Sequence, residues 1–104
     1  MENSEKYFIA CVYNEIANMP ANCNRISWNK YPVEMVVDNE TLITRVDGIE
    51  YRDVCPMRGT RRNRVEMGKV VCKHICDTWG GTMDEVTEYG NAFIAELYQV
   101  LGIQ

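Results

Sequence analysis

Residues 33–55 read VEMVVDNETLITRVDGIEYRDVC, and apolar and polar side chains alternate through most of this stretch. A period of two is typical of β-strands that bury one face. Asp47-Gly48 separates two of the apolar runs, and this dipeptide favours a type I′ hairpin. We therefore expect strands at residues 33–37, 41–46 and 49–55, joined as an antiparallel meander.

Helical spacing precedes these strands. Apolar side chains recur every three or four positions within residues 4–19, at Phe8, Val12, Ile16 and Met19. Asn3 or Ser4 would cap this helix and Pro20 would end it, although residues 7–13 taken alone also fit a strand. Residues 21–32 are typical of a loop, with one short strand expected around Ile26 and Trp28.

Two more helices are expected after residue 60. The first places one apolar stripe at Val65, Gly68, Cys72, Ile75 and Trp79, and Gly80-Gly81 would end it. Residues 82–85, Thr-Met-Asp-Glu, form a capping-box sequence before a second stripe at Val86, Tyr89, Phe93, Leu97 and Leu101. Gly68 and Gly90 interrupt these helices at a cost of about 1 kcal/mol each, so we expect the two helices to cross closely there.

The predicted fold class is α+β, in one domain over residues 1–104: an N-terminal helix, an antiparallel three- to four-stranded meander and two C-terminal helices. Antiparallel hairpins argue against a doubly wound parallel sheet, whose strands need crossover connections. Because so few elements make a small core with exposed apolar edges, we expect a homodimer or a higher homo-oligomer.

Composition limits the classes of function. The formal net charge is −4, which argues against indiscriminate binding to nucleic acid or to an anionic membrane. The first residues do not resemble a signal peptide, and no stretch is long enough to span a bilayer, so we expect a cytoplasmic protein. The five scattered cysteines fit reduced thiols rather than a disulfide framework.

The most unusual feature is a cationic cluster at an expected helix start. Four of the chain's seven arginines lie there: Arg58, Arg61, Arg62 and Arg64. A helix start carries about half a positive charge, so each exposed cation there costs on the order of 0.3 to 1 kcal/mol. Without these four, 7 of the 11 basic residues face 15 acidic ones, and no acid occurs between Asp53 and Glu66. We therefore expect a negatively charged group from outside.

The first hypothesis is non-catalytic binding of a phosphate-containing small molecule, most plausibly a nucleotide. Guanidinium groups of Arg58, Arg61, Arg62 and Arg64 would hold phosphate, and Gly59 and Thr60 would add backbone and hydroxyl donors. Trp28 or Tyr31 would stack on a base. No cofactor, metal ion or catalytic residue is expected, because the chain has a single histidine and two serines, Ser4 and Ser27.

Two alternatives use the arginines differently. They could contact an acidic protein surface, as in a small viral or bacterial accessory protein that inhibits or sequesters its partner. They could instead pair with Asp84, Glu85 or Glu88 of the same chain or of a neighbouring copy. A concave pocket would favour a small ligand, and a broad flat surface would favour a protein partner.

Residues 55–61, Cys-Pro-Met-Arg-Gly-Thr-Arg, resemble the cysteine, five residues, arginine loop of protein tyrosine phosphatases. The resemblance implies Cys55 as nucleophile and Arg61 as a phosphate ligand, and it makes a cysteine-dependent phosphatase a second alternative. The chain departs from that family at Pro56, which removes a loop amide, and at Arg62, where serine or threonine is usual. Its antiparallel hairpins also differ from that family's parallel strands.

Cys72-Lys-His74-Ile-Cys76 contains residue types that bind zinc. On a helix, however, Cys72 and Cys76 share a face, and His74 points about 200° away from Cys72. We therefore expect Cys72 to lie in the core and His74 on the surface, without a metal ion.

Overall fold

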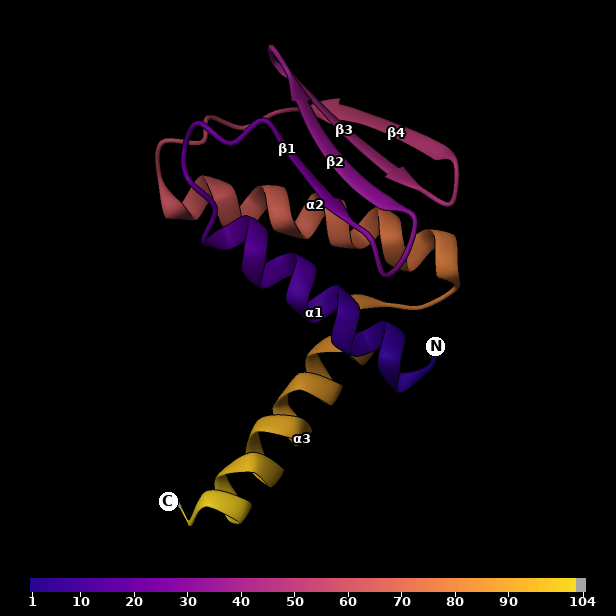
Figure 1. Cartoon of the computed structure of the whole chain (residues 1–104), viewed down its shortest axis with the longest axis vertical. Helices are drawn as coiled ribbons and strands as arrows, with labels where there is room; N and C mark the ends of the chain where they lie inside the picture. The colour runs from indigo at the N-terminus through magenta and orange to yellow at the C-terminus, as the bar shows by residue number, and fades with distance from the viewer. Residues whose placement is uncertain (103–104) are drawn as a thin grey trace.

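The structure is a computed structural model that describes residues 1–102. In chain order its elements are α1 (Asn3–Ala17), β1 (Arg25–Trp28), β2 (Val33–Asp38), β3 (Thr41–Val46), β4 (Ile49–Val54), α2 (Arg61–Trp79) and α3 (Met83–Leu101). The predicted α+β layout is confirmed, with four antiparallel strands between one N-terminal and two C-terminal helices (Figure 1). The side chains of Phe93, Leu97, Tyr98, Val100 and Leu101 lie outside the described residues, so the predicted stripe on α3 is described only at Val86 and Tyr89.

The sheet is a meander in the order β1-β2-β3-β4, and every neighbouring pair is antiparallel. Val46 pairs with Ile49 across the last turn. There Asp47 has a φ of 51° and Gly48 a φ of 83°. Two positive φ angles are what a type I′ turn requires, so the hairpin predicted from Asp47-Gly48 is confirmed. The loop expected at residues 21–32 contains a full edge strand, β1.

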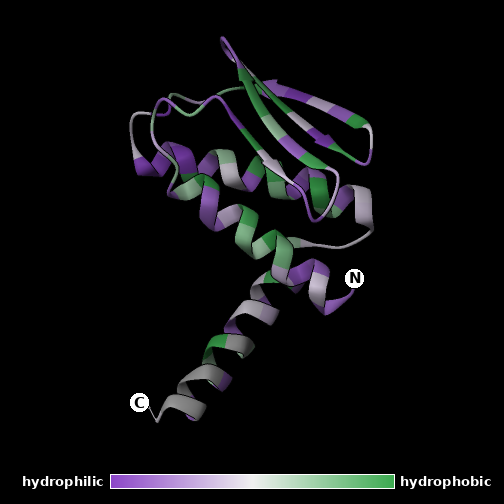
Figure 2. Cartoon of the chain, viewed as in Figure 1, coloured by the Kyte–Doolittle hydropathy of each residue, from purple (hydrophilic) through white to green (hydrophobic). Residues whose placement is uncertain are grey.

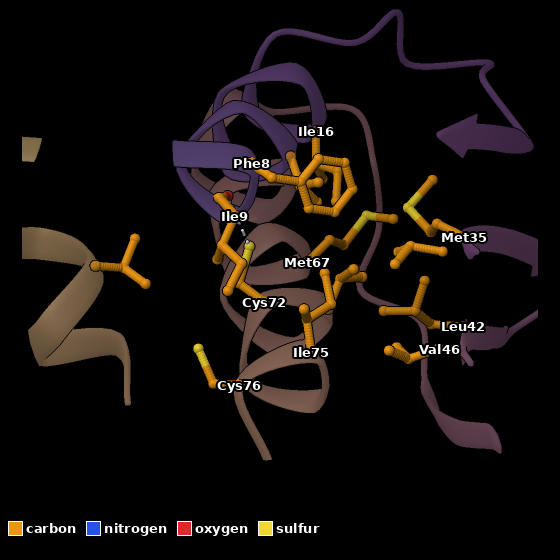
Figure 3. Close-up of a cluster of buried hydrophobic side chains, with 14 of the residues drawn as sticks. Phe8, Ile9, Ile16, Met35, Leu42, Val46, Met67, Cys72, Ile75 and Cys76 are labelled. Atoms are coloured by element: carbon orange, nitrogen blue, oxygen red, sulfur yellow. Dashed lines mark hydrogen bonds between the residues drawn. The ribbon is translucent and has the colours of Figure 1, made fainter. Parts of the chain in front are cut away.

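One face of the sheet rests on α1 and α2 and encloses the core. Figure 3 shows Met67 and Ile75 of α2 pointing toward Met35, Leu42 and Val46 of the sheet, and Phe8 and Ile16 of α1 closing one end. Cys76 points the other way, toward α3. The core is therefore formed by α1, α2 and the central strands, and α3 adds Val86 to it.

Local capping explains where the helices begin and end. Thr60 caps α2 by accepting a hydrogen bond from the backbone amide of Asn63 at 3.2 Å, and Gly80 ends α2 with a φ of 75°. The Thr82 hydroxyl likewise accepts from the Glu85 amide at 3.2 Å at the start of α3. These predicted caps are confirmed.

The predicted cap of α1 was wrong. Asn3 already belongs to the helix, and the residue at the cap position is Glu2. The backbone amide of Glu2 donates to the Glu5 carboxylate at 2.9 Å. This bond is part of a capping box, which satisfies free amide groups at the helix start.

The close crossing predicted between the two C-terminal helices was also wrong. Gly68 faces α1: a Cβ added there would lie 3.4 Å from Cδ2 of Tyr13 and 3.7 Å from Cβ of Ile16. A Cβ added at Gly90 would meet no atom within 4 Å in the part of the chain that the structure describes. The reason is visible in Figure 1, where α3 leaves the body at a steep angle and does not run along α2.

Hydropathy follows this arrangement. Figure 2 shows hydrophobic residues along the central strands and hydrophilic residues at the start of α2. On the outer face of the sheet, salt bridges run in a chain from Arg25 to Glu34, Arg45, Glu50 and Arg52. Among residues 1–102, none of the helices has both the length and the apolar content needed to cross a bilayer.

Candidate functional site

The start of α2 divides the clustered arginines into two pairs. Arg61 and Arg62 are exposed, whereas Arg58 and Arg64 are half-buried. Within the described part of the chain, neither Arg61 nor Arg62 has a hydrogen-bond or ion-pair partner. These two side chains are therefore available to a partner.

Arg58 and Arg64 hold the segment between β4 and α2 in place. Nη1 of Arg58 donates to the Cys23 carbonyl oxygen and, at 2.9 Å, to Oδ1 of Asn24. Nη1 of Arg64 donates to the carbonyl oxygen of Arg58 at 2.7 Å, and its Nε is buried without a partner. Because these guanidinium groups bind backbone carbonyls, they fix the segment against the loop that precedes β1.

The same-chain carboxylates expected as alternative partners lie elsewhere. Glu85 approaches the Met1 amino group at 4.0 Å, and Asp84 and Glu88 form no ion pair in the part of the chain that the structure describes. The positive charge at the start of α2 is therefore not neutralised by the described acids of its own chain.

Backbone donors accompany the two exposed arginines. The Asn63 amide is bound by the Thr60 hydroxyl, and the Arg64 amide donates to the Thr60 carbonyl oxygen at 3.2 Å. The amides of Arg61 and Arg62 have no such acceptor among the described residues, as is usual in the first turn of a helix. Gly59 is exposed beside them. Together these groups make a surface of positive charge and free donors.

The aromatic residues expected to complete a nucleotide site lie far from the arginines. Nε1 of Trp28 donates to Oε2 of Glu15 at 2.5 Å. The Tyr31 ring packs against Phe8 at 4.5 Å and against Trp79 at 5.1 Å between centroids. Trp79 is the last residue of the 19-residue α2, so about 27 Å of helix separates it from Arg61. The structure thus does not bring Trp28 and Tyr31 together with the arginines.

The Cys55 thiol has the wrong character for a nucleophile. Its Sγ donates to the Pro56 carbonyl oxygen at 3.3 Å. Burial raises the pKa of Cys55, and the charge of Arg58 only partly offsets this. A phosphatase nucleophile needs the opposite shift, because the thiolate is the reactive form. Neither this pKa nor the antiparallel β4 before it supports the phosphatase resemblance.

The three residues of the Cys72-x-His74-x-Cys76 segment point to different partners. Sγ of Cys72 donates to the Ile9 carbonyl oxygen at 3.6 Å, and Nε2 of His74 lies 2.7 Å from Oδ2 of Asp53. Burial raises the pKa of Cys76 to about 11. The expected core position of Cys72 is confirmed, whereas His74 is half-buried rather than on the surface.

Sequence reasoning missed the polar cluster around His74. Its ring stacks on Tyr51 with centroids 4.2 Å apart, and the Tyr51 hydroxyl lies 2.7 Å from the Thr78 hydroxyl. Asp53 and Tyr51 are two residues apart on β4 and so share one strand face, which is the signal that could have revealed the cluster. The cluster joins the edge strand β4 to α2.

The clustered arginines line neither of two hollows found in the surface of the described residues. The larger, about 920 Å³, lies among the three helices and includes Tyr13, Val86 and Ile94 in its wall. The smaller, about 330 Å³, lies between α1 and the end of β1 and includes Trp28. No local sequence pattern predicts the larger hollow.

Comparisons with known protein families, with curated proteins and with solved structures found no match. The function must therefore be argued from the site itself, since a fold alone does not define one.

Proposed function

We propose that this protein is a non-catalytic interaction module whose Arg61 and Arg62 bind an acidic surface on another protein. The observation that carries the proposal is the pair of exposed guanidinium groups at the start of α2, which no described carboxylate of the chain neutralises. The surrounding composition is acidic, with 15 acidic against 11 basic residues, so this cationic surface stands out locally.

The shape of the surface favours a protein partner over a free nucleotide. Small-molecule sites are concave and bury most of their ligand, and these arginines line neither hollow. Trp28 and Tyr31 pack at the other end of α2, so they cannot stack on a base held by Arg61. Arginine is enriched at protein interfaces, where a shallow surface is sufficient.

Electrostatics supplies the driving force. Each cation in the first turn of a helix costs on the order of 0.3 to 1 kcal/mol, and a carboxylate brought by a partner would offset that cost. Arg58 and Arg64 contribute indirectly, because their bonds to backbone carbonyls position the segment that leads into Arg61. A pre-positioned surface loses less conformational entropy on binding.

We also propose a cytoplasmic location. It is supported by the cysteines, all of which are free thiols in the structure. Cys72 and Cys76 are buried in the core, and reduced thiols are typical of cytoplasmic proteins.

The proposal is tested by titrating the full chain with a fluorescent hexaglutamate peptide at low salt and measuring anisotropy. Arg61→Ala and Arg62→Ala should each weaken binding about two- to fivefold, since exposed ion pairs contribute up to about 1 kcal/mol. The matched control is Lys30→Ala, which removes an exposed cation near the opposite end of α2 and should leave affinity unchanged. Binding should fall as salt is raised.

Two results would overturn the proposal. The first is equal binding by the arginine variants and by Lys30→Ala. The second is a thermal shift with inorganic phosphate or a nucleoside triphosphate, lost in Arg61→Ala, without any binding of the peptide; this would favour a phosphate-containing small ligand instead.

A further inference from the structure

The described side chains in the second half of α3 are not covered by other parts of the chain. Every described side chain from residue 91 to the end of the helix is exposed: Asn91, Ala92, Ile94, Ala95, Glu96 and Gln99. Figure 1 shows this half of α3 extending away from the sheet and from α2. Of the described side chains of α3, only Val86 is buried.

An unsupported half-helix is not stable by itself. Isolated helices shorter than about 12 to 15 residues are marginal in water, because nucleation is costly and tertiary packing supplies most helical stability. Gly90 and Asn91, two weak helix formers, stand at the base of this half. The exposed half therefore needs a surface to pack against.

The larger hollow, called the groove below, runs beside the first half of α3 and reaches the second half at Asn91 and Ile94. Its volume is about 920 Å³ and its lining is mostly apolar, with Tyr13 from α1 and Val86 and Ile94 from α3. Ile94 is 47% exposed within it. No atom of the described residues lies within 4 Å of a Cβ built on Gly90, so another helix can approach the backbone closely at this point.

The charges around the groove indicate what fits there. Lys69, Lys73 and Asp77 of α2 form part of the lining. Lys69 binds the Glu66 carboxylate at 3.1 Å, whereas Lys73 has no partner among the described residues. The sequence of α3 contains four acidic residues and no basic one: Asp84, Glu85, Glu88 and Glu96. A helix that is apolar on one side and acidic beside it complements an apolar groove with the unpaired Lys73 at its edge, and α3 is itself such a helix.

We propose that the groove binds α3 of a second copy of this chain, and that the first copy's α3 enters the second copy's groove in return. Each copy has the same helix and the same groove, so this reciprocal binding forms a two-fold symmetric dimer. The two α3 helices then approach near Gly90, Ile94 becomes buried, and acidic side chains of each α3 come within reach of the lysines on the other α2. This surface is separate from Arg61 and Arg62.

The first test is sedimentation equilibrium of the full chain. The expected mass at high protein concentration is twice the 12.0 kDa of one chain. Ile94→Glu should raise the dimer dissociation constant at least about tenfold, because it places a charge in the apolar contact. The control is Val54→Glu, which changes a side chain that is 84% exposed on the edge strand β4. Circular dichroism checks that both variants keep their helices.

The second test exchanges the charges. One variant carries Lys69→Glu and Lys73→Glu, and the other carries Glu88→Lys and Glu96→Lys. Each variant alone should be monomeric, since residues 69 and 73 of its groove and residues 88 and 96 of its α3 then carry charges of the same sign, whereas an equal mixture should form a heterodimer at both grooves.

Three outcomes would overturn the proposal. The unaltered chain could stay monomeric at every concentration. Val54→Glu could dissociate a dimer that Ile94→Glu leaves intact, which would place the contact at the sheet edge. The two charge variants could fail to associate when mixed.

Discussion

The two C-terminal helices have the same length but different support. α2 and α3 each contain 19 residues, and both begin after a threonine cap. α2 lies against the sheet and α1 and buries six residues: Met67, Gly68, Val71, Cys72, Ile75 and Cys76. α3 buries only Val86 among its described side chains. An amphipathic pattern therefore predicts a helix but does not say which surface covers it.

The largest expected difference between the helices is the loss of stability when one side chain is truncated to alanine. Met67→Ala should destabilise the protein by about 2 to 5 kcal/mol, because Met67 is fully buried and the deletion leaves a cavity. Ile94→Ala should change stability by less than about 0.5 kcal/mol at concentrations where the protein is monomeric. Urea unfolding followed by circular dichroism measures both. Similar losses for the two variants would mean that α3 is packed within the single chain.

An intermediate effect is expected at the two helix glycines. Gly90→Ala should stabilise the monomer by up to about 1 kcal/mol, because no atom lies within 4 Å of the new Cβ. Gly68→Ala should increase stability by less, because its Cβ comes into ordinary contact with Tyr13 at 3.4 Å.

Gly68→Leu is the informative companion, since a larger side chain must clash with Tyr13 and Ile16 of α1 and should destabilise. Thermal melts rank the three variants. A Gly68→Leu protein as stable as Gly68→Ala would contradict the close crossing of α1 and α2.

The smallest expected effect is on stability at low pH, and it involves Glu34 in the sheet that α2 covers. Hydrogen bonds from Arg25 and then Arg45 lower the pKa of Glu34 below its ordinary value of 4.5. A carboxyl group with a lowered pKa stabilises the fold above its unfolded pKa, and this contribution disappears as pH falls through the folded pKa.

Glu34→Gln should therefore reduce the loss of stability between neutral pH and pH values below 4.5. Glu40→Gln, which changes an exposed acid without an ion pair in the described residues, is the control. Chemical unfolding across that pH range measures the difference, and identical pH profiles for the two variants would remove the role given to Glu34.

Features governed by neighbouring residues could be predicted from the sequence. The Asp47-Gly48 turn, the Thr60 cap and the Gly80 helix end each depend on hydrogen bonds or φ angles within a few residues. The partner of Gly68 could not be predicted, because the choice between α1 and α3 depends on the angle at which α3 leaves Gly81.

The candidate site was only partly predictable for the same reason. The sequence located the arginine cluster, but it could not separate Arg61, which is exposed, from Arg58, whose acceptor is a carbonyl 35 residues earlier. It also could not show that Tyr31 packs on Trp79 at the far end of α2. The groove beside α3 involves three helices, and no local pattern encodes it.

In the arrangement proposed here, α2 is held by its own chain and α3 by a second copy. Hydrogen–deuterium exchange of the full chain over a dilution series tests this most directly. The amides of α2 should stay protected at every concentration, and those of residues 91–101 should lose protection as the dimer dissociates. Protection of residues 91–101 that does not change on dilution, or its absence at all concentrations, would contradict the account.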